Sequence, residues 1–349
     1  MVTVGTDAHK SSHTLVAVDE NGCRLGQQTV PAVGAGHLAA LQWARQWPER
    51  RWAIEDCRHV TRRLERDLLA AGELVLRVPP KLMLESRRPA RTRGKSDAID
   101  ALAVARAALR EPGLPVARLE GRSRELRLLV DYREDLVAER TRLQSRLRWH
   151  VHELEPELVI ASGALDCYKL LEQLEAVLAA HPGLVAEIAG KQLRQIRELT
   201  SEIKQLERRI ANLVLPVAPS LLALFGCGAL TAAKLIGETA GPTRFRSRAA
   251  FAMHDGSAPI PASSGDRQRH RLNRGGNRQL NAALHRIAIT QLRAPGCGRD
   301  YYQHRREGGD SKAEALRCLK RRISDQVYRR LRLDAHLLDT LGDTQPTAA

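Results

Sequence analysis

The chain is poor in aromatic residues, lacks paired cysteine motifs and has no long apolar run. Phe, Trp and Tyr make up only 3% of its residues, too few for the stacked-ring platforms that many single-strand binders use. The six cysteines form no Cys-x-x-Cys pair, which argues against a zinc site or a disulfide framework. No apolar stretch reaches the roughly 18 residues of a membrane span, and no signal peptide opens the chain. These absences predict a cytoplasmic protein with no membrane partner.

Acidic residues are also scarce. Lys and Arg number 56 against 40 Asp and Glu, which gives a net charge of +16. A charge of this size favours a polyanionic partner such as nucleic acid and is unusual for an enzyme of small metabolites. With 349 residues, the chain can form two or three domains that each bury a core.

Residues 1–115 alternate short β-branched runs with helical stretches, a pattern typical of an α/β layer. Strands are expected at 2–6, 14–18, 25–30, 51–55 and 74–78. The first three are joined by short turns into an antiparallel meander, and helices separate the others. This order is that of a ribonuclease-H-like fold, because a plain doubly wound sheet would lack the opening meander.

Residues 116–215 predict a coiled-coil helical region. Leu129, Leu136 and Leu143 recur every seven residues, as do Ile196, Ile203 and Ile210, which is the spacing of a helix-packing seam. Two long helices with a shorter one between them are expected. The seam can be filled by antiparallel packing within the chain or by dimerisation, and the sequence does not separate these alternatives.

Residues 216–349 are predicted to form a mainly helical domain. It opens with Gly226-Cys227-Gly228 between two apolar runs, which resembles a helix-hairpin-helix turn whose backbone amides approach a phosphate. A tight turn without a ligand is the alternative for Gly226 and Gly228.

Farther along, residues 266–306 contain ten arginines and two acids. A charge run is usually a solvated face, but this one is nearly free of acid and consists of the residue that binds phosphate bidentately. We therefore expect nucleic-acid contact there. The candidate residues are Arg267, Arg269, Arg271, Arg274 and Arg278.

Four carboxylates occupy positions suited to metal binding. Asp7 and Glu55 end the first and fourth expected strands, and Asp97 and Asp100 open a helix that Ser96 caps. Each alone could be a turn residue or a helix-dipole partner. Four acids brought together in so basic a chain need cations, and oxygen ligands select Mg²⁺ or Mn²⁺. Two such ions can clamp the attacking and leaving oxygens of phosphoryl transfer.

The combined motifs resemble the IS110 family of insertion-sequence transposases, also called bridge-RNA-guided recombinases. The resemblance rests on a Gly-x-Asp strand, an Ile-Glu strand end, Lys-Ser-Asp-x-x-Asp-Ala, the helical spacer, Ala-Ser-Ser-Gly and Arg-x-Asn-Arg-Gly-Gly-Asn-Arg. It spans nearly the whole chain. It implies a RuvC-like domain whose DEDD carboxylates match Asp7, Glu55, Asp97 and Asp100.

The same resemblance implies a serine nucleophile at Ser264, with Ser263 as the alternative. It also implies that this serine and the metal ions act on one phosphate. Glu55-Asp56-Cys57 departs from the Glu-Ala-Thr-Gly frequent in relatives, so Asp56 can perturb metal binding or share the role of Glu55. From the residues alone, a Ser-Ser-Gly segment is more often a turn, and a serine hydroxyl needs a base or a metal to become a nucleophile.

The resemblance implies a bacterial, nucleoid-associated recombinase that exchanges strands through a phosphoserine. Its partners would be double-stranded target and donor DNA, a noncoding guide (bridge) RNA and further subunits in a homodimer or homotetramer. Two alternatives stay open. One is a RuvC-like nuclease that hydrolyses branched DNA with the same carboxylates, and the other is a basic coiled-coil RNA-binding protein without catalysis.

Overall fold

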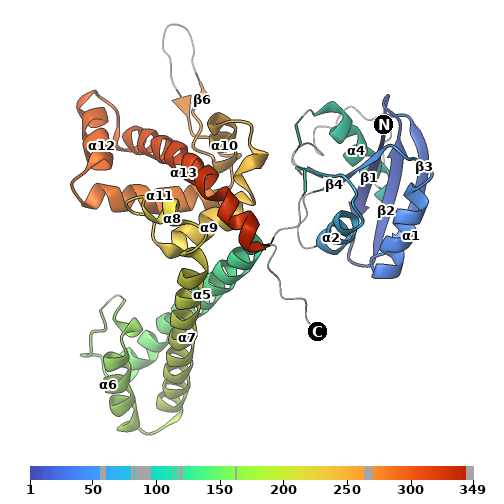
Figure 1. The fold of residues 1–349 in the computed structure, drawn as a ribbon. Coiled ribbons are helices and arrows are strands. Elements are labelled where there is room, and N and C mark those ends of the chain that lie inside the picture. The colour runs from blue at the N-terminus through green and yellow to red at the C-terminus, as the bar shows by residue number, and fades with distance from the viewer. Residues whose placement is uncertain are drawn as a thin grey trace. The chain divides into compact units, whose positions relative to one another are not determined.

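The computed structural model describes residues 1–55, 60–79, 82, 96–111, 113–114, 116–117, 121–161, 163–262 and 270–342. The chain divides into two compact units, Met1–Leu119 and Glu120–Ala349, and each is described by itself (Figure 1). The three-domain division predicted from the sequence stays a prediction. None of the helices within the described ranges combines the length and the apolar character that crossing a membrane requires.

The N-terminal unit is built on a five-stranded mixed sheet. Its strands are β1 (Val2–Ala8), β2 (Ser12–Val18), β3 (Arg24–Pro31), β4 (Arg50–Glu55) and β5 (Val75–Val78). The spatial order is β3-β2-β1-β4-β5. The first three strands pair antiparallel, and β4 runs parallel to both β1 and β5. This arrangement confirms the predicted RuvC-like order of a meander followed by parallel strands.

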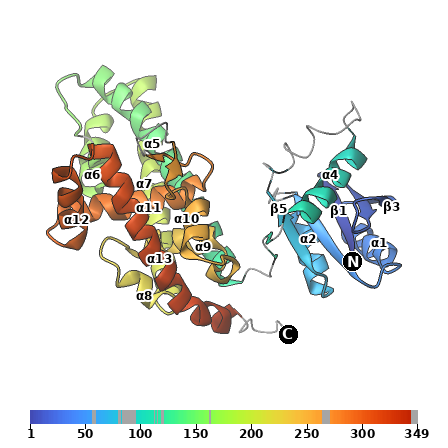
Figure 2. The same ribbon diagram turned by 90° about the horizontal axis from the view of Figure 1, so that it is seen from above.

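Helices cover both faces of this sheet (Figure 2). One face packs Trp52, Ile54 and neighbouring apolar residues against α1 (Gly34–Ala44) and α2 (Arg62–Ala70). The other face packs against α4 (Asp97–Arg110), an alanine-rich helix. Because side chains alternate between the faces of a strand, β1 presents Val4 and Thr6 to the first face and Gly5 and Asp7 to the second.

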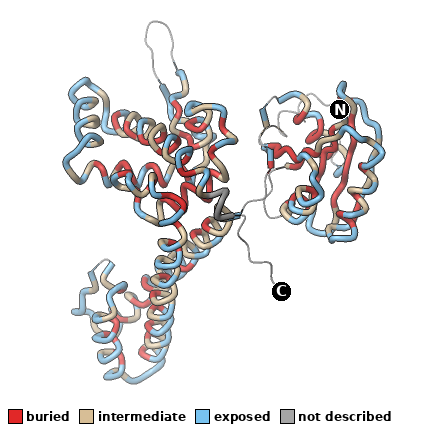
Figure 3. The backbone as a smooth tube through the Cα atoms, in the orientation of Figure 1, coloured by how far each residue is buried: buried red, intermediate tan, exposed pale blue. Residues whose placement is uncertain are grey.

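A helical arm opens the second unit. It consists of α5 (Arg122–Leu154), the short helices η1 (Ala164–Asp166) and α6 (Tyr168–Ala179), and α7 (Leu184–Val214). Arg209 of α7 bonds to Glu125 near the start of α5, whereas Thr200 bonds to Arg140 farther along α5, so the two long helices are antiparallel. The predicted Ile positions are buried between them, as the tube in Figure 3 shows for the arm as a whole. This packing is the first of the two alternatives, antiparallel packing within the chain.

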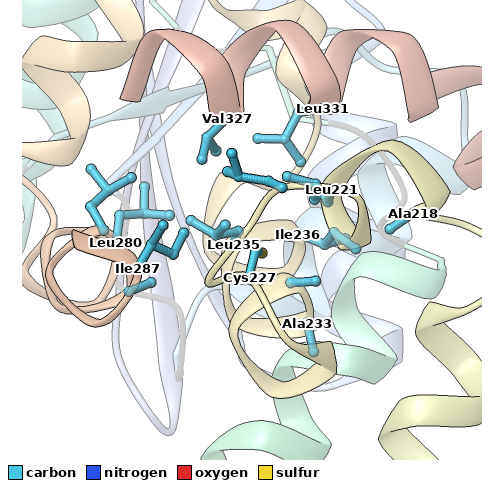
Figure 4. Close-up of a cluster of buried hydrophobic side chains, with 14 of the residues drawn as sticks. Ala218, Leu221, Cys227, Ala233, Leu235, Ile236, Leu280, Ile287, Val327 and Leu331 are labelled. Carbon is cyan, nitrogen blue, oxygen red and sulfur yellow. The ribbon is translucent and has the colours of Figure 1, made fainter. Parts of the chain in front are cut away.

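The rest of the second unit is a helical assembly. It contains α8 (Pro219–Leu222), α9 (Ala229–Thr239), η2 (Pro242–Arg244), α10 (Arg248–Asp255), α11 (Arg278–Arg293), α12 (Cys297–Glu307) and α13 (Lys312–Gly342), and the short strands β6 (Ile260–Pro261) and β7 (His270–Arg271). Figure 4 shows its core, to which α9, α11 and α13 contribute side chains such as Ile236, Leu280 and Leu331. Leu126 and Ile210 of the arm belong to the same core, so the arm is rooted in this assembly.

Candidate functional site

Two of the predicted carboxylates lie at adjacent strand ends. Thr6 of β1 is paired with Ile54 of β4 in the parallel register, and Asp7 and Glu55 are the next residues on their strands. The equal alternation along paired strands places both on the sheet face that α4 covers. Asp7 is 8% exposed, and Glu55 is half-buried.

Gly5 allows the other two carboxylates to reach this edge. A Cβ at Gly5 would lie 2.1 Å from the backbone oxygen of Ala101 and 2.7 Å from Cβ of Ala105, so only glycine lets α4 pack this closely on β1. Ser96 caps the helix, its Oγ accepting a bond from the backbone N–H of Ile99 at 3.3 Å. The predicted cap is therefore confirmed, and the first turn of α4 is held at the end of β1.

The first turn of α4 brings Asp97 to Asp7, with His9 between them. Nε2 of His9 lies 3.0 Å from Oδ2 of Asp7 and 3.5 Å from Oδ1 of Asp97. One ligand atom from each of the three residues falls within 4.8 Å of the others. Glu55 and Asp100 are not members of this tight cluster among the described residues.

The pKa of Asp7 responds to its burial and to the charged groups around it. Burial raises the pKa of Asp7, the contact with His9 lowers it, and the charges of Asp100 and Asp97 raise it further, with a net increase. Asp100 is itself 8% exposed. Removing carboxylates from water and placing them beside like charges disfavours their ionised forms, so the cluster is a site that a cation would stabilise.

The donor set fits a divalent cation. Asp7 and Asp97 offer carboxylate oxygens at cluster distance, and Asp100 and Glu55 add carboxylates at the same edge of the sheet. Oxygen ligands of this kind suit Mg²⁺ or Mn²⁺. The ring nitrogen of His9 adds a ligand that Mn²⁺ accepts more readily than Mg²⁺ does, because imidazole suits the later divalent metals.

His9 was missed in the sequence analysis. The sequence contained a hint of its role: His9 follows Asp7 by two positions, and this spacing places two side chains on the same side of an extended chain. It was not decisive, because β1 ends at Ala8 and the backbone N–H of His9 bonds to the carbonyl of Ser12 in the β1–β2 turn. Only the turn geometry aims the ring at Asp7.

The second candidate region is the segment 271–278, which is anchored by its asparagines and glycines. The side-chain amide of Asn273 donates to the carbonyl of Met253 at 3.0 Å, and the backbone N–H of Asn277 donates to the carbonyl of His254 at 2.6 Å. A Cβ at Gly276 would lie 2.3 Å from Gly256, so these two backbones touch. The uncharged residues of the motif thus fix the segment on the end of α10.

The arginines of this motif are free of acidic partners. Arg271, Arg274 and Arg278 are exposed, and among the residues that the structure describes no carboxylate lies within 4.0 Å of their guanidinium groups. Asn277 caps α11 by accepting bonds from the N–H groups of Gln279 and Leu280. Arg278 therefore sits in the first turn of α11, where the helix dipole and cationic side chain both favour an anion.

Several predicted residues lie outside the described part of the chain. They are Ser263, Ser264, Arg267 and Arg269 of the segment between β6 and β7, together with Asp56. The described neighbours show only that Pro261 and His270 are paired, so the two ends of that segment start from one short ribbon.

The glycine turn before α9 packs against α11. Gly226 has φ +89°, and a Cβ there would lie 3.0 Å from the carbonyl oxygen of Ile287. Gly228 is exposed and precedes α9. The helix before the turn, α8, has only 4 residues, since Pro216 and Pro219 interrupt the apolar run. Phosphate binding by Gly226 and Gly228 stays a prediction.

Two family models match this chain, and each covers one of the candidate regions. A DEDD transposase model of IS110, described as "Transposase", matches residues 4–156, and a model described as "Transposase IS116/IS110/IS902 family" matches residues 218–303. The carboxylates fall within the first match, and the segments around Ser264 and Arg274 fall within the second.

Relatives that align over most of the chain include two proteins of insertion elements and a putative transposase. The chain is 28% identical to the "Insertion element IS116 uncharacterized 44.8 kDa protein" of Streptomyces clavuligerus, over 95% of this chain and 94% of the relative. It is 26% identical to the corresponding 42 kDa protein of IS900 from Mycobacterium paratuberculosis, over 95% and 96%. It is also 26% identical to a putative transposase of Sinorhizobium fredii, over 86% and 75%.

Among solved structures, Thermus thermophilus RuvC in complex with a Holliday junction substrate aligns with 31% of this chain and 93% of its own, at 17% identity and a TM-score of 0.25.

Proposed function

The chain belongs to the IS110 family of insertion-sequence transposases, and we propose that it is a recombinase that cuts and rejoins DNA strands with divalent metal ions. The observation that carries this proposal is the convergence of Asp7 and Asp97 at one end of the sheet, inside the region matched by the DEDD transposase model. Membership of this family implies DNA binding and phosphoryl transfer, and the DEDD domain implies a divalent metal.

We assign metal binding to Asp7, Glu55, Asp97 and Asp100. Two Mg²⁺ or Mn²⁺ ions, when bound, polarise the phosphate and stabilise the attacking and leaving oxygens. Asp7 is held by β1 and by its contact with His9, and Asp97 is held by the capped start of α4. Anchoring ligands on a strand and a helix end keeps them in fixed geometry, which a site of this kind requires.

We assign strand attack to Ser264. In this step the Oγ–H bond of serine breaks, an Oγ–P bond forms, and the bond from phosphorus to the adjoining deoxyribose oxygen breaks as that oxygen takes up a proton. The phosphodiester energy stays in the phosphoserine, so a hydroxyl of another strand can attack it and restore Ser264 without ATP. Support comes from the Ala-Ser-Ser-Gly motif and from its place within the second family match.

We further propose that a guide RNA selects the target and donor DNA by base pairing and that the enzyme acts as a dimer or tetramer. A protein that leaves sequence recognition to a guide RNA contacts mainly the sugar–phosphate backbone of the nucleic acid. Arg271, Arg274 and Arg278, which have no acidic partner among the described residues, suit that kind of contact, because guanidinium groups bind phosphate without reading base sequence.

Trapping a covalent adduct tests the proposal. The full-length protein, its cognate RNA, Mg²⁺ and a nicked suicide substrate should give a denaturant-resistant protein–DNA adduct. Ser264→Ala should abolish the adduct and the recombinant product, whereas Ser263→Ala, the matched neighbour, should keep at least part of both. The reverse pattern would move the nucleophile to Ser263. Cleavage by both variants at the wild-type rate, with free phosphate ends, would establish water as the nucleophile and the protein as a nuclease.

Mixing two inactive variants tests the assembly. Ser264→Ala and Asp97→Asn proteins each retain one half of the proposed chemistry. Recovery of cleavage in the mixture would show that the serine of one subunit serves the metal ligands of another, which makes the oligomer part of the site. Absence of recovery, with both variants folded and co-assembled, would assign both halves to one subunit.

A further inference from the structure

The helices α10, α11 and α13 pack against one another beside the β6–β7 ribbon (Figure 1). Their side chains, with those of the segment 271–278, line a basic groove. It consists of two adjoining hollows. The first, of about 640 Å³, is lined by Arg274, Arg278, His285 and Lys320 together with uncharged residues. The second, of about 360 Å³, lies toward α12 and α13. The two hollows share Gly256, Leu272, Asn273 and Lys320, so they are parts of one groove with Lys320 at their junction.

The charges of the groove are strongly one-sided. No Asp or Glu is present among the described residues that line the first hollow. The acids of the second hollow, Asp310 and Glu314, contact Arg305 at 2.6 Å and Arg317 at 3.8 Å. The positive charge that remains uncompensated therefore lies at the junction and along the 271–278 segment.

Lys320 is held in place by a buried polar network. Its ammonium donates to Oδ1 of Asn281, and Nδ2 of Asn281 donates to the carbonyl of Asp255 at 2.9 Å, which fixes the orientation of the amide. The Asp255 side chain is fully buried, and it accepts bonds from the hydroxyl of Ser324 and from the backbone N–H of Ser257 at 2.7 Å. This network holds a lysine at a defined position on the rigid α13.

The ammonium of Lys320 is incompletely compensated. It has three donors, and Asn281 is its hydrogen-bond partner among the described residues. No described carboxylate lies within 4.0 Å of it. Burial lowers the pKa of Lys320 by more than the charge of the buried Asp255 raises it. Burial together with the charge of Lys320 lowers the pKa of His285. An anion bound in the groove would raise both pKa values, because a nearby negative charge favours the protonated, cationic forms.

We propose that the basic groove is a binding site for the sugar–phosphate backbone of one nucleic-acid strand, with Lys320 as the phosphate-binding residue at its centre and Arg274 and Arg278 along one wall. A phosphate suits the ammonium because Lys binds it as a point charge. The two hollows on either side of Leu272–Asn273 suit a strand that continues past the junction. The proposal rests on the proposed function only in taking nucleic acid as the ligand.

The direct test removes the lysine charge. Full-length Lys320→Gln, Lys320→Arg and a matched control, Lys191→Gln on the exposed side of α7, are titrated with labelled single-stranded DNA, single-stranded RNA and duplex DNA over a series of salt concentrations. Loss of one phosphate contact should reduce the log–log salt slope by about 0.7 for a single strand or about 0.9 for a duplex. Lys320→Arg should restore the slope, and Lys191→Gln should leave it unchanged.

The probe that loses slope identifies the strand. A change with RNA alone assigns the groove to the guide, and a change with DNA alone assigns it to the substrate. Unchanged slopes and affinities of Lys320→Gln on all three probes would overturn the proposal.

Chemical labelling of the unmodified protein gives a second test that does not depend on the folding of a variant. An amine-reactive reagent should modify Lys320 in the free protein, and bound nucleic acid should protect it while Lys191 stays reactive. Equal labelling of Lys320 with and without saturating nucleic acid would contradict the proposal. Neither test needs catalysis, so wild-type protein that forms no DNA adduct would reject the serine mechanism and leave the groove intact.

Discussion

The two units of the chain concentrate charge of opposite sign by different means. In the N-terminal unit, Asp7 and Asp97 are themselves the convergent groups, and the sheet edge and the start of α4 bring them together. In the second unit, Asn273, Asn277 and Gly276 anchor the motif, while its exposed arginines form no ion pair with any described carboxylate. A motif residue can thus act directly at a site or hold the segment that carries the acting residue.

The carboxylate cluster and the arginine segment also differ in what they cost the stability of the free protein. Burying Asp7 beside other carboxylates costs stability until a cation binds, because burial and the charges of Asp100 and Asp97 raise its pKa. Exposed guanidinium groups cost little, because water solvates them in the absence of nucleic acid. The first site should therefore respond sharply to single substitutions, and the second should respond in small additive steps.

The largest effect is expected for the carboxylates. Asp97→Asn should abolish strand cleavage and weaken Mn²⁺ binding in calorimetric titration, because one ligand charge of the cluster is lost while the fold is retained. Asp135→Asn, the same change at an exposed position on α5, should alter neither. Wild-type cleavage in the presence of excess chelator would contradict a metal role for this cluster.

Next in size is Gly5→Ala. The added Cβ would collide with the backbone of α4 at Ala101, so α4 must shift away from β1. We expect the free energy of unfolding to fall by roughly 3 kcal/mol or more, as in severe overpacking, and Mn²⁺ binding to be lost. The control is Gly34→Ala, where a Cβ meets nothing within 4 Å. Urea unfolding followed by tryptophan fluorescence measures the stability of the two variants. Equal stabilities would show that α4 is not held at this contact.

A comparable or smaller effect is expected on the stability of the N-terminal unit at acidic pH. Burial, followed by the charges of His37 and His9, lowers the pKa of His13 from 6.5 to about 4. As pH falls below 6.5 the unfolded chain takes up this proton first, so the free energy of unfolding of the N-terminal unit should decrease by on the order of 3 kcal/mol by pH 4. His13→Gln should lose this part of the acid sensitivity, and His152→Gln, at an exposed position, should keep it. An identical pH profile for His13→Gln would refute the assignment.

The smallest effect per residue is expected in the arginine segment. Replacing Arg271, Arg274 and Arg278 together by Ala should reduce the log–log salt slope of duplex binding by about two to three, since each lost phosphate contact contributes about 0.9. Replacement of three exposed arginines of the arm, Arg142, Arg146 and Arg208, removes the same charge elsewhere. Equal slopes for both triple variants would mean that net charge, and not this segment, determines binding.

The sheet was largely predictable from the sequence because its strands are short β-branched runs that turns and helical stretches separate. The five strands occur within one or two residues of their expected ends, and Ser96 caps α4 as predicted. The importance of Gly5 was not predictable, because a glycine in a strand weakens it in general. Only the contact with α4 explains why the position must lack a side chain.

The candidate sites were less predictable. Acidic residues at strand and helix ends pointed to one edge of the sheet, but the aim of His9 depends on the turn after Ala8. Lys320 carries no local signal at all, because it is one of many basic residues along α13 and gains its place only through Asn281. The arginine run, in contrast, was visible from composition alone, and the asparagines that anchor it were not distinguished from it.

The arm has a consequence for synthesis of the chain. α5 has 33 residues and is about 50 Å long at 1.5 Å per residue, and it carries two separate cores. The outer core joins Leu147 to Ile196, 49 residues later in the chain, whereas the inner core joins Leu126 to Leu331, 205 residues later. During translation the outer core can close while later helices are still being made, and the inner one must wait for α13. A chain that ends before α13 would therefore have a folded outer core, while the apolar residues of the inner core stay exposed to water. Such a chain is expected to aggregate.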